Sequence, residues 1–510
     1  MINLTDIPNN WKLTKLIEFA HVIMGQSPPS NTYNYQKIGL PFFQGKAEFT
    51  DLHPIIKKWC SEPNKISLPD DILLSVRAPV GAVNIANVEC CIGRGLSAIR
   101  YPECNKFLFY FFRFVEKKLD EKGTGSTFRA ISGDVLKNVT LFLPPLREQH
   151  RIVAKIEALF SELDKGIESF KTAREQLKIY RQALLKHAFS GKLTEQWRAE
   201  NQDKLETAEA LLQRIQTERE QRYQQHLKEW EANGILGGKP KAPKTLPLLT
   251  TEELAELPEL PKEWIWVRPE DICAPEPYSI GIGPFGSNLK VSDYRECGIP
   301  LIFVKNITRS NFFLDLKYID EIKYKELISH SVKALDLVIT KMGDPPGDCE
   351  IYPENAPNAV LTADCLKFRL WEKFANRKLY KFSINSNLVK RQLGLITKGV
   401  AQKKISVERF KTVCLPFLCV EEQQMLVQEI DSKLSLCDQL DQTLTTALQQ
   451  AQALRQSILK KAFSGQLVPQ DPKDEPASVL LQRIQAEKVA LVTPIKIKGK
   501  KLLSLKLRTS

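Results

Sequence analysis

Several features that mark common protein classes are scarce or missing in this sequence. Its 6 histidines lie too far apart for a local zinc cluster, and its 11 cysteines form no C-x-x-C pair, so we expect reduced thiols and no metal. The most apolar stretch, residues 108–115, contains Arg113 and is far too short to cross a bilayer. The first residues lack the basic and apolar segments of a signal peptide. These absences predict a soluble, cytoplasmic protein with no membrane partner.

The motifs of nucleotide and DNA chemistry are missing as well. A P-loop ends in Lys-Ser/Thr after a longer glycine-rich stretch, and the GGKP that begins at Gly237 has neither the length nor the hydroxyl. An amino-methyltransferase needs an aromatic side chain after Asn/Asp-Pro-Pro to stack on the extruded base, but Gly347 follows Asp344-Pro345-Pro346. No Ser-His-Asp order and no carboxylate pair can be singled out. The sequence therefore predicts no catalytic residue.

Positive charge is what the chain has in excess. Lys and Arg number 73 against 60 Asp and Glu, which gives a formal net charge of +13. With 43% hydrophobic and 26% charged residues the composition is that of a folded protein. A length of 510 residues, at roughly 100 to 200 per domain, predicts about three or four structural units. The charge suits a polyanionic partner such as nucleic acid, although an ordinary solvated surface would also give it.

A repeated order of segments is the main internal pattern. The residues KHAFSGKL at 186–193 return as KKAFSGQL at 460–467, 274 positions later, with six of eight letters identical. Shorter matches keep the same order: Glu148-Gln149 with Glu422-Gln423, LLQRIQ at 211–216 with the same letters at 480–485, and the segment around Trp11 with that around Trp264. The chain is therefore organised as A, B, A′, B′.

The A and B segments differ in kind. Residues 1–146 and 258–418 are rich in Pro, Gly, aromatic and β-branched residues in short runs, which indicates strands in mixed domains. Apolar residues recur at a 3.5-residue period over 156–184 and 430–458, which is typical of a coiled coil. Because two such segments stand in one chain, we expect their seams to pair. The alternative is an amphipathic helix packed on its neighbouring domain.

The ends of the B segments carry their own signals. Gly191 and Gly465, one after each AFS, are expected to cap the long helices at their C-termini. A second helix is expected over about 207–232, before a Gly/Pro/Lys-rich linker. Residues 495–510 hold Lys and Arg without an acidic residue, which favours a flexible basic tail or a non-specific phosphate contact.

Longer motifs carry a specific resemblance. The stretches LPPLREQHRIVAKIEALFSELD from Leu143 and LPFLCVEEQQMLVQEIDSKL from Leu415 each open a B segment, and AFSGKL or AFSGQLVPQDPKDEPASVLLQRIQAEK follows. Placed after two unlike domains, these motifs closely resemble the specificity subunit of type I restriction-modification systems over nearly the whole chain.

The resemblance implies an α+β fold in which two mixed α/β target-recognition domains are separated by long helices that pair as an antiparallel coiled coil, with a pseudo-two-fold internal repeat. The segments would be target-recognition domain 1 (1–146), first spacer helix (147–192), second helix and linker (193–257), target-recognition domain 2 (258–418), second spacer helix (419–466), and C-terminal helix and basic tail (467–510).

The resemblance also implies a function. The subunit would recognise double-stranded DNA without being catalytic, and would recruit two methyltransferase subunits and further motor-nuclease subunits. S-adenosylmethionine, ATP and magnesium would belong to those partners, with no cofactor in this subunit. Because the two recognition domains differ in their loops, we expect an asymmetric, bipartite target with one half-site for each domain.

The family's DNA contacts lie on loops of each recognition domain. The resemblance gives these candidates: Gln26, Ser27, Gln44, Lys46, Arg77, Thr124, Ser126, Thr127 and Arg129 in the first domain, and Gly286, Ser287, Lys305, Asn306, Lys341, Thr397, Lys398, Gln402 and Lys403 in the second. Glycine lets the backbone approach phosphate, Lys and Arg contact phosphate or guanine, and Gln and Asn can bind adenine. The alternative for each residue is a surface turn.

Two rival functions remain open at this point. One is a coiled-coil scaffold whose A domains bind a non-DNA ligand such as a protein or a carbohydrate. The other is a stand-alone modification enzyme with an unrecognised site. The isolated chain distinguishes them, because a scaffold shows no salt-sensitive DNA binding and an enzyme turns over without partners.

Overall fold

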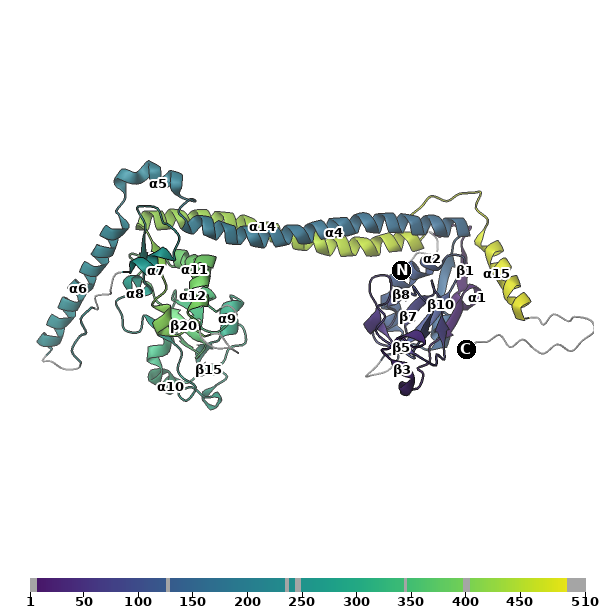
Figure 1. Ribbon diagram of the computed structural model, residues 1–510, viewed down its shortest axis with the longest axis horizontal. Coiled ribbons are helices and arrows are strands. Elements are labelled where there is room, and N and C mark those ends of the chain that lie inside the picture. The colour runs from purple at the N-terminus through teal and green to yellow at the C-terminus, as the bar shows by residue number, and fades with distance from the viewer. Residues whose placement is uncertain are drawn as a thin grey trace, which may run out of the picture. The chain divides into compact units, whose positions relative to one another are not determined.

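The computed structural model describes residues 7–124, 129–233, 238–243, 249–343, 346–397 and 404–492, apart from the side chains of Lys204, Leu491 and Val492. The chain forms two compact units. Unit 1 comprises Met1–Lys171 and Leu444–Ser510, and unit 2 comprises Thr172–Thr443. Each unit contains sheets, short helices and a part of each of two long helices (Figure 1). The expected α+β class with two mixed domains is confirmed.

The sheets of unit 1 are small and have largely buried strands. In its described part a four-stranded sheet has the order β2-β10-β7-β8, a five-stranded sheet has the order β3-β5-β4-β9-β6, and β1 pairs with β11. The strands are β1 (Lys12–Lys15), β2 (His21–Met24), β3 (Tyr33–Asn34), β4 (Leu40–Phe43), β5 (Trp59–Cys60), β6 (Ile66–Ser67), β7 (Ile72–Ser75), β8 (Val83–Ile85), β9 (Cys90–Ile92), β10 (Leu96–Arg100) and β11 (Thr140–Leu143). The helices are α1 (Leu16–Phe19), α2 (Asn105–Glu121), α3 (Gly133–Lys137) and α15 (Ala477–Val492). Helix α2 contacts β7 and β8 and contributes the buried Phe107, Phe109 and Phe112 to the core.

Unit 2 has the same kinds of element. In its described part the sheet orders are β13-β20-β17-β18, β15-β14-β19-β16 and β12-β21. The strands are β12 (Ile265–Val267), β13 (Ile280–Ile282), β14 (Ile299–Ile302), β15 (Tyr318–Ile319), β16 (Ser331–Val332), β17 (Leu337–Thr340), β18 (Cys349–Ile351), β19 (Ala359–Leu361), β20 (Cys365–Phe368) and β21 (Leu415–Phe417). The helices are α5 (Glu195–Asn201), α6 (Ala208–Ala232), α7 (Thr251–Ala255), α8 (Pro269–Ile272), α9 (Val304–Thr308), α10 (Glu321–Glu326), α11 (Arg377–Asn385), α12 (Asn387–Leu395) and α13 (Val407–Phe410).

The two units repeat one sheet plan. The order β2-β10-β7-β8 recurs as β13-β20-β17-β18, and the parallel pair of β4 with β9 recurs as β14 with β19. The pairing of β1 with β11 recurs as β12 with β21. The repeat seen in the sequence is therefore a repeat of the fold.

The two long helices are α4 (Leu146–Phe189) and α14 (Val420–Phe463). Each has 44 residues, and α14 begins and ends 274 positions after α4. Both end in the same way: Gly191 and Gly465 have φ values of +71° and +75°, and the N–H one residue beyond each glycine donates back to the helix, to the carbonyls of His187 and Lys461. This is the glycine cap that the sequence predicts, because glycine adopts positive φ without strain.

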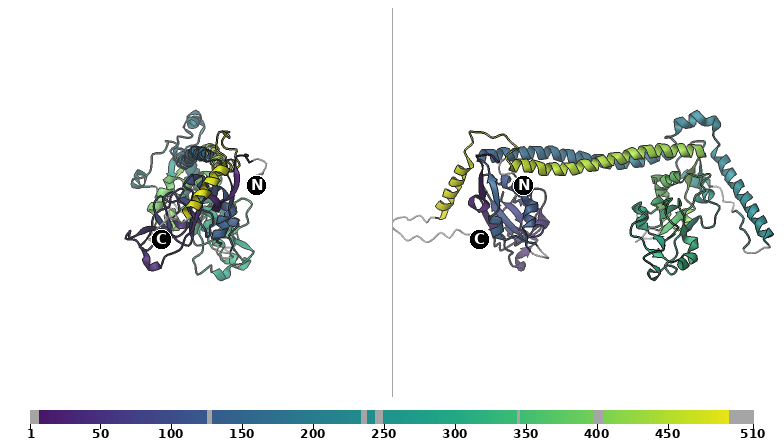
Figure 2. Two further views of the ribbon diagram at one scale, coloured as in Figure 1. Left: turned by 90° about the vertical axis from the view of Figure 1, so that its right-hand side faces the viewer. Right: turned by 180° about the vertical axis from the view of Figure 1, so that it is seen from behind.

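The long helices pair antiparallel within each unit. In unit 2 the guanidinium of Arg174 lies 2.9 Å from Asp441 and that of Arg181 lies 2.6 Å from Asp438, so position rises along α4 as it falls along α14. In unit 1 Arg455 forms an ion pair with Asp164. The helices run side by side in both the front and the back view (Figures 1 and 2). The expected antiparallel pairing is confirmed.

The seam between the helices is less apolar than the sequence period predicts. That period places Tyr180 and Leu440 in the seam, but their side chains are 50% and 47% exposed. The ion pairs of Arg174 and Arg181 occupy this stretch instead. Near its ends each long helix packs apolar residues into a domain core. At the ends the structure therefore matches the alternative, an amphipathic helix packed on its neighbouring domain.

A buried carboxylate joins the start of α4 to the first domain. The indole Nε1 of Trp11 donates to Oε2 of Glu148 at 3.1 Å, and Nε2 of Gln470 donates to Oε1 at 2.6 Å. Burial raises the pKa of Glu148 above its usual value, and these two hydrogen bonds oppose that rise. The next residue, Gln149, accepts a hydrogen bond from the Tyr101 hydroxyl at 3.0 Å.

Unit 2 has the same joint at the start of α14. The indole of Trp264 donates to Glu422 at 2.9 Å, and the Thr194 hydroxyl and the Arg198 guanidinium donate to the other carboxylate oxygen at 2.7 and 2.9 Å. Gln423 accepts a hydrogen bond from the backbone of Asn376 at 2.7 Å. The repeated Trp and Glu-Gln letters of the sequence therefore mark one repeated joint.

The second helix of each B segment packs apolar residues into a domain core and also places one cation on backbone carbonyls of that domain. Lys488 of α15 donates to the carbonyls of Ile17 and Ala20 at the end of α1, at 3.1 and 3.3 Å. Arg219 of α6 donates to the carbonyls of Glu270, Asp271 and Cys273 at the end of α8. Carbonyls at a helix C-terminus lack internal partners, so a cation there satisfies them.

One lysine is buried in the sheet of unit 2. The side chain of Lys367 in β20 is among the largest that are fully buried, and its ammonium donates to the carbonyls of Ser329 at 3.1 Å and Ser331 at 2.5 Å. Burial, with a smaller effect of the nearby Arg369 guanidinium, lowers its pKa from 10.5 to about 8. Charging this group in the folded protein is therefore costly.

We predict that Lys367→Met removes a pH dependence of stability. Between pH 8 and 10.5 the unfolded chain holds a proton that the folded chain has released, so the free energy of unfolding rises with pH across this window. The difference between wild type and variant should change by on the order of 3 kcal/mol. Urea unfolding of wild type and Lys367→Met at several pH values measures it, with the exposed Lys333→Met as control. Parallel curves for wild type and Lys367→Met would contradict the buried, destabilised ammonium.

Candidate nucleic-acid interface

Glycines pack three loops of unit 1 against one another. The backbone N–H of Gly25, just after β2, donates to the carbonyl of Leu96, and that of Gly93 donates to Phe43 at the end of β4. A Cβ atom on Gly25 would lie 2.2 Å from the Gly93 oxygen, and one on Gly95 would lie 2.3 Å from the Gln44 oxygen. Only glycine fits such close backbone approaches. The loops after β2, β4 and β9 therefore meet at one place.

Two further loops join this place through backbone hydrogen bonds. Val76, at the end of β7, donates to the carbonyl of Gly95 at 3.0 Å, and Ala78 donates to the carbonyl of Arg129 at 2.9 Å. Thr124 and Ala130 donate to each other at 3.0 Å. The structure thus gathers loops that are distant in sequence, and it gives one continuous edge to unit 1.

Most first-domain candidates project from this edge. Gln26, Gln44, Lys46, Arg77, Thr124 and Arg129 are exposed. Ser27 is half-buried, and its hydroxyl accepts a hydrogen bond from the Arg94 backbone at 3.2 Å, so it also holds the loop in shape. Arg129 lies 3.6 Å from Asp120. Ser126 and Thr127 lie outside the described residues.

Arg94 is an edge residue that the sequence reasoning missed. It is exposed between the buried Gly93 and Gly95, in the turn from β9 to β10. Neither it nor Arg77 forms an ion pair within the described part of the chain. The signal in the sequence is the Gly-Arg-Gly triplet. Its two glycines have no side chains that could cover the guanidinium between them. A guanidinium so placed can bind phosphate or the guanine edge.

Unit 2 builds the corresponding edge with different residues. The N–H of Gly283, after β13, donates to Cys365, and a Cβ on Gly283 would lie 2.0 Å from the Thr362 oxygen. The backbone N–H of Lys341 donates to the carbonyl of Asp364 at 2.8 Å. This hydrogen bond is equivalent to the one from Val76 to the carbonyl of Gly95 in unit 1. These matches make Ala363 the counterpart of Arg94.

The same matches identify the counterpart of Arg77. Arg77 bridges Ala130 in unit 1, and Met342 bridges Lys404 in unit 2. Met342 is therefore the counterpart of Arg77, and Lys341 is not. The ammonium of Lys341 turns to the carbonyl of Ala363 at 3.2 Å, which places it half-buried at the base of the edge.

The prediction of Asn306 as a DNA contact is wrong. Its side chain is fully buried, donates to the carbonyls of Asn311 and Leu314, and accepts from the backbone of Phe303. An amide whose hydrogen bonds hold its own loop cannot also bind a base. Its neighbour Lys305 is half-buried and lies 3.4 Å from Asp315.

The remaining second-domain candidates divide into three groups. Gly286 and Ser287 are exposed, beside Phe285, which is 69% exposed and which the sequence reasoning did not select. The Thr397 hydroxyl donates to the carbonyl of Gly394 at 2.8 Å beyond the end of α12. Lys398, Gln402 and Lys403 lie outside the described residues, as do Asp344 and Pro345.

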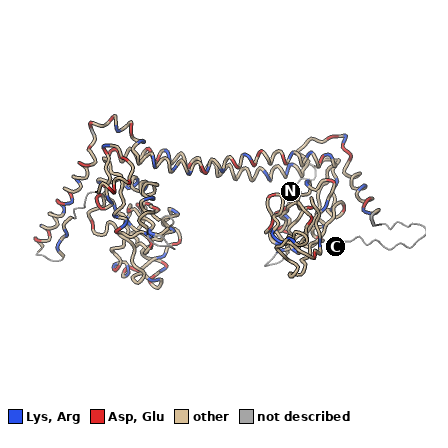
Figure 3. The backbone as a smooth tube through the Cα atoms, in the orientation of Figure 1, with Lys and Arg blue, Asp and Glu red and all other residues tan. Residues whose placement is uncertain are grey.

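Charge is mixed over both units. Basic and acidic residues are interspersed along α4 and in both domains (Figure 3). Along α14 the charged residues are acidic from Glu421 to Asp441, except for Lys433, and basic from Arg455 on. Among the described residues no group of three or more His, Cys, Asp and Glu stands where it could hold a metal ion. In the same part of the chain no helix is long and apolar enough to cross a membrane.

Comparison with known proteins finds similarity to specificity subunits of type I restriction enzymes. Residues 8–169 match the family model of the type I restriction modification DNA specificity domain. The chain is 24% identical to the EcoKI specificity subunit of Escherichia coli and 22% identical to the EcoDI specificity subunit, over 95% of its own length and 97% and 96% of theirs. It is 38% identical to a Methanocaldococcus jannaschii protein described as the MjaX specificity subunit, over 37% of this chain, and spans 44% of that relative's length.

Solved structures of the same kind of subunit are similar in part. The HsdS subunit from Thermoanaerobacter tengcongensis is 47% identical over 31% of this chain and 40% of its own, with a TM-score of 0.29. The type I restriction-modification S subunit from M. genitalium is 14% identical over 91% of this chain and 98% of its own, with a TM-score of 0.33.

We predict that Gly95→Ala destabilises unit 1, because its Cβ would lie 2.3 Å from a backbone oxygen that cannot move without breaking the loop junction. The expected loss is about 1 to 3 kcal/mol. Gly45→Ala in the adjoining loop is the matched control, since nothing lies within 4 Å of its added Cβ. Thermal unfolding measures both, and equal melting temperatures for the two variants would show that the loops are not packed this closely.

Proposed function

We propose that this chain is a type I restriction-modification specificity subunit, and that it recognises an asymmetric, bipartite sequence in double-stranded DNA with one half-site for each unit. The observation that carries the proposal is the repeated edge. Unit 1 presents Arg94 where unit 2 presents Ala363, and Arg77 where unit 2 presents Met342. One frame with two different sets of side chains fits two different half-sites.

Recruitment of partner subunits is the second part of the proposal. The chain binds two methyltransferase subunits and further motor-nuclease subunits, and the duplicated long helices support two equivalent sites for one partner. S-adenosylmethionine, ATP and magnesium then act in those partners. The chain itself carries no catalytic residue and works where the DNA lies, in the cytoplasm.

We expect Arg94→Ala to lower the affinity of the isolated chain for its target DNA by about tenfold, because the exposed guanidinium has no ion pair among the described residues and is free for DNA. A phosphate contact would reduce the slope of log affinity against log salt by about one, and a base contact would relax one target position. Titration at several salt concentrations separates these two roles.

Arg147→Ala is the matched control, because it removes the same charge from an exposed position at the start of α4. Its affinity should stay close to that of wild type. Equal affinities for wild type and Arg94→Ala at every salt concentration would remove the edge of unit 1 from the DNA interface.

Exchange of loops between specificity subunits tests the proposed function directly. Trp11 and α1 hold unit 1 together through Glu148 and Lys488, so the exchange keeps residues 1–20 and replaces residues 21–138 with the equivalent segment of a relative. Methylome sequencing of a host that carries the chain and its partner subunits should show one altered half-site and one unchanged. Two altered half-sites, or none, would contradict the assignment of one half-site to each unit.

A further inference from the structure

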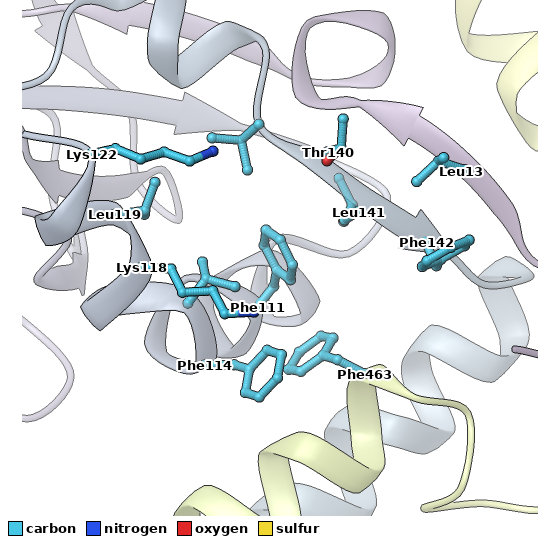
Figure 4. Close-up of a pocket in the computed structure, with 12 residues that line it drawn as sticks. Leu13, Phe111, Phe114, Lys118, Leu119, Lys122, Thr140, Leu141, Phe142 and Phe463 are labelled. Carbon is cyan, nitrogen blue, oxygen red and sulfur yellow. The ribbon is translucent and has the colours of Figure 1, made fainter. Parts of the chain in front are cut away.

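A pocket of unit 1 lies between α2 and the strand pair β1 and β11. It has a volume of about 240 Å³ and is lined by residues of α2, β1 and β11 and by Phe463 at the end of α14. Figure 4 shows the α2 side chains facing Leu13 and Phe142, which are cross-strand partners on β1 and β11. Leu13 is 54% exposed, so the apolar wall is open to solvent.

Aromatic packing makes the floor of this pocket rigid. Phe463, from the second AFSG motif, stacks on Phe114 with ring centroids 5.5 Å apart and an interplanar angle of 20°. Phe107 and Phe111 contact the same ring at 5.3 and 5.5 Å. One wall of the pocket therefore comes from a motif that the long helices repeat.

Two lysines stand on the rim without carboxylate partners. Lys118 and Lys122 line the pocket one helical turn apart and are exposed. In the described part of the chain neither forms an ion pair, whereas Lys106 of the same helix pairs with Glu157 at 2.7 Å. Like charges four residues apart destabilise a helix slightly. An opposite charge from outside would relieve this repulsion.

We propose that the pocket binds an acidic, amphipathic segment of a partner protein, with an apolar side chain against Leu13 and Phe142 and carboxylates on Lys118 and Lys122. This inference rests on the proposed function, in which the chain works together with other subunits. The volume is below the roughly 300 to 1,000 Å³ of pockets that take small molecules, and suits one large side chain. Surface pockets that take a single apolar anchor beside a charged rim are typical of protein interfaces.

Two other occupants fit the chemistry less well. Residues 495–510 of this chain carry Lys and Arg without an acidic side chain, so they would add to the positive charge at the rim. A DNA phosphate would pair with the lysines but would gain nothing from the phenylalanine-lined floor. The partner therefore has to supply both negative charge and apolar surface.

Carbodiimide cross-linking tests the contact, because this reagent joins a lysine only to a carboxylate that it touches. The complex of the full chain with its methyltransferase and motor subunits is treated and the linked peptides are identified by mass spectrometry. We expect Lys118 or Lys122 linked to Asp or Glu in an apolar segment of a partner. The link between Lys106 and Glu157 inside the chain is the internal positive control.

Charge reversal provides the second measurement. The double substitution Lys118→Glu and Lys122→Glu should weaken binding of the linked partner about tenfold, and Leu13→Ser should weaken it severalfold. Lys117→Glu is the matched control, because Lys117 is exposed on the same helix and does not line the pocket. Circular dichroism and DNA affinity should match wild type for all these variants.

Each outcome decides between distinct conclusions. Partner links together with weaker assembly of the pocket variants support the proposal. Normal assembly with reduced DNA affinity and salt slope would make the lysines DNA contacts and overturn it, as would normal behaviour in both assays. Links only to the carboxylate of the chain's own C-terminus would overturn it too. If the wild-type chain fails to assemble with these subunits, the proposed function fails first, and this proposal with it.

Discussion

The rest of the structure depends on one buried carboxylate at the start of each long helix. Glu148 and Glu422 occupy the third position of their helices, where free backbone N–H groups favour negative charge. Each accepts an indole hydrogen bond from the tryptophan that precedes the first strand of its domain. Loss of the carboxylate would leave the buried indole N–H without a partner, at a cost of about 1 to 3 kcal/mol. The joint therefore connects the start of one long helix to the first strand of the domain and to the segment that follows the other long helix.

This constraint explains why so much of the fold is legible in the sequence. Trp11 and Trp264 and the two Glu-Gln pairs recur because both joints need the same donors and acceptors. The capping glycines recur because both helices end in positive φ. A helix of 44 residues displaced by 274 positions at both ends follows from these marks. The close backbone approaches at Gly25 and Gly283 also required glycine, which is why the loops could be selected as candidates.

The parts that the sequence did not reveal depend on side-chain direction. Asn306 has the chemistry of a base-reading amide, and only its burial shows that the loop uses all of its hydrogen bonds. Arg94 gives no periodic signal, since its exposure follows from the contact between two turns that are distant in sequence. Tyr180 keeps the heptad spacing, yet Arg181 takes the contact with the partner helix. Spacing along the sequence cannot tell which of two adjacent residues faces the partner helix.

The described residues of the two edges place their positive charge differently. In unit 1 Lys46, Arg77 and Arg94 form no ion pair within the described residues, and all three are exposed. In unit 2 the ammonium of Lys341 is bound to a carbonyl, and that of Lys305 faces Asp315. Phosphate binding draws on unpaired cations, whereas apolar and uncharged groups such as Phe285 contact bases or sugars. Under the proposed function these three cations of unit 1 therefore contribute salt-sensitive affinity. At the matching positions of unit 2, Met342 and Ala363 carry no charge, so these two positions contribute through shape and uncharged contacts.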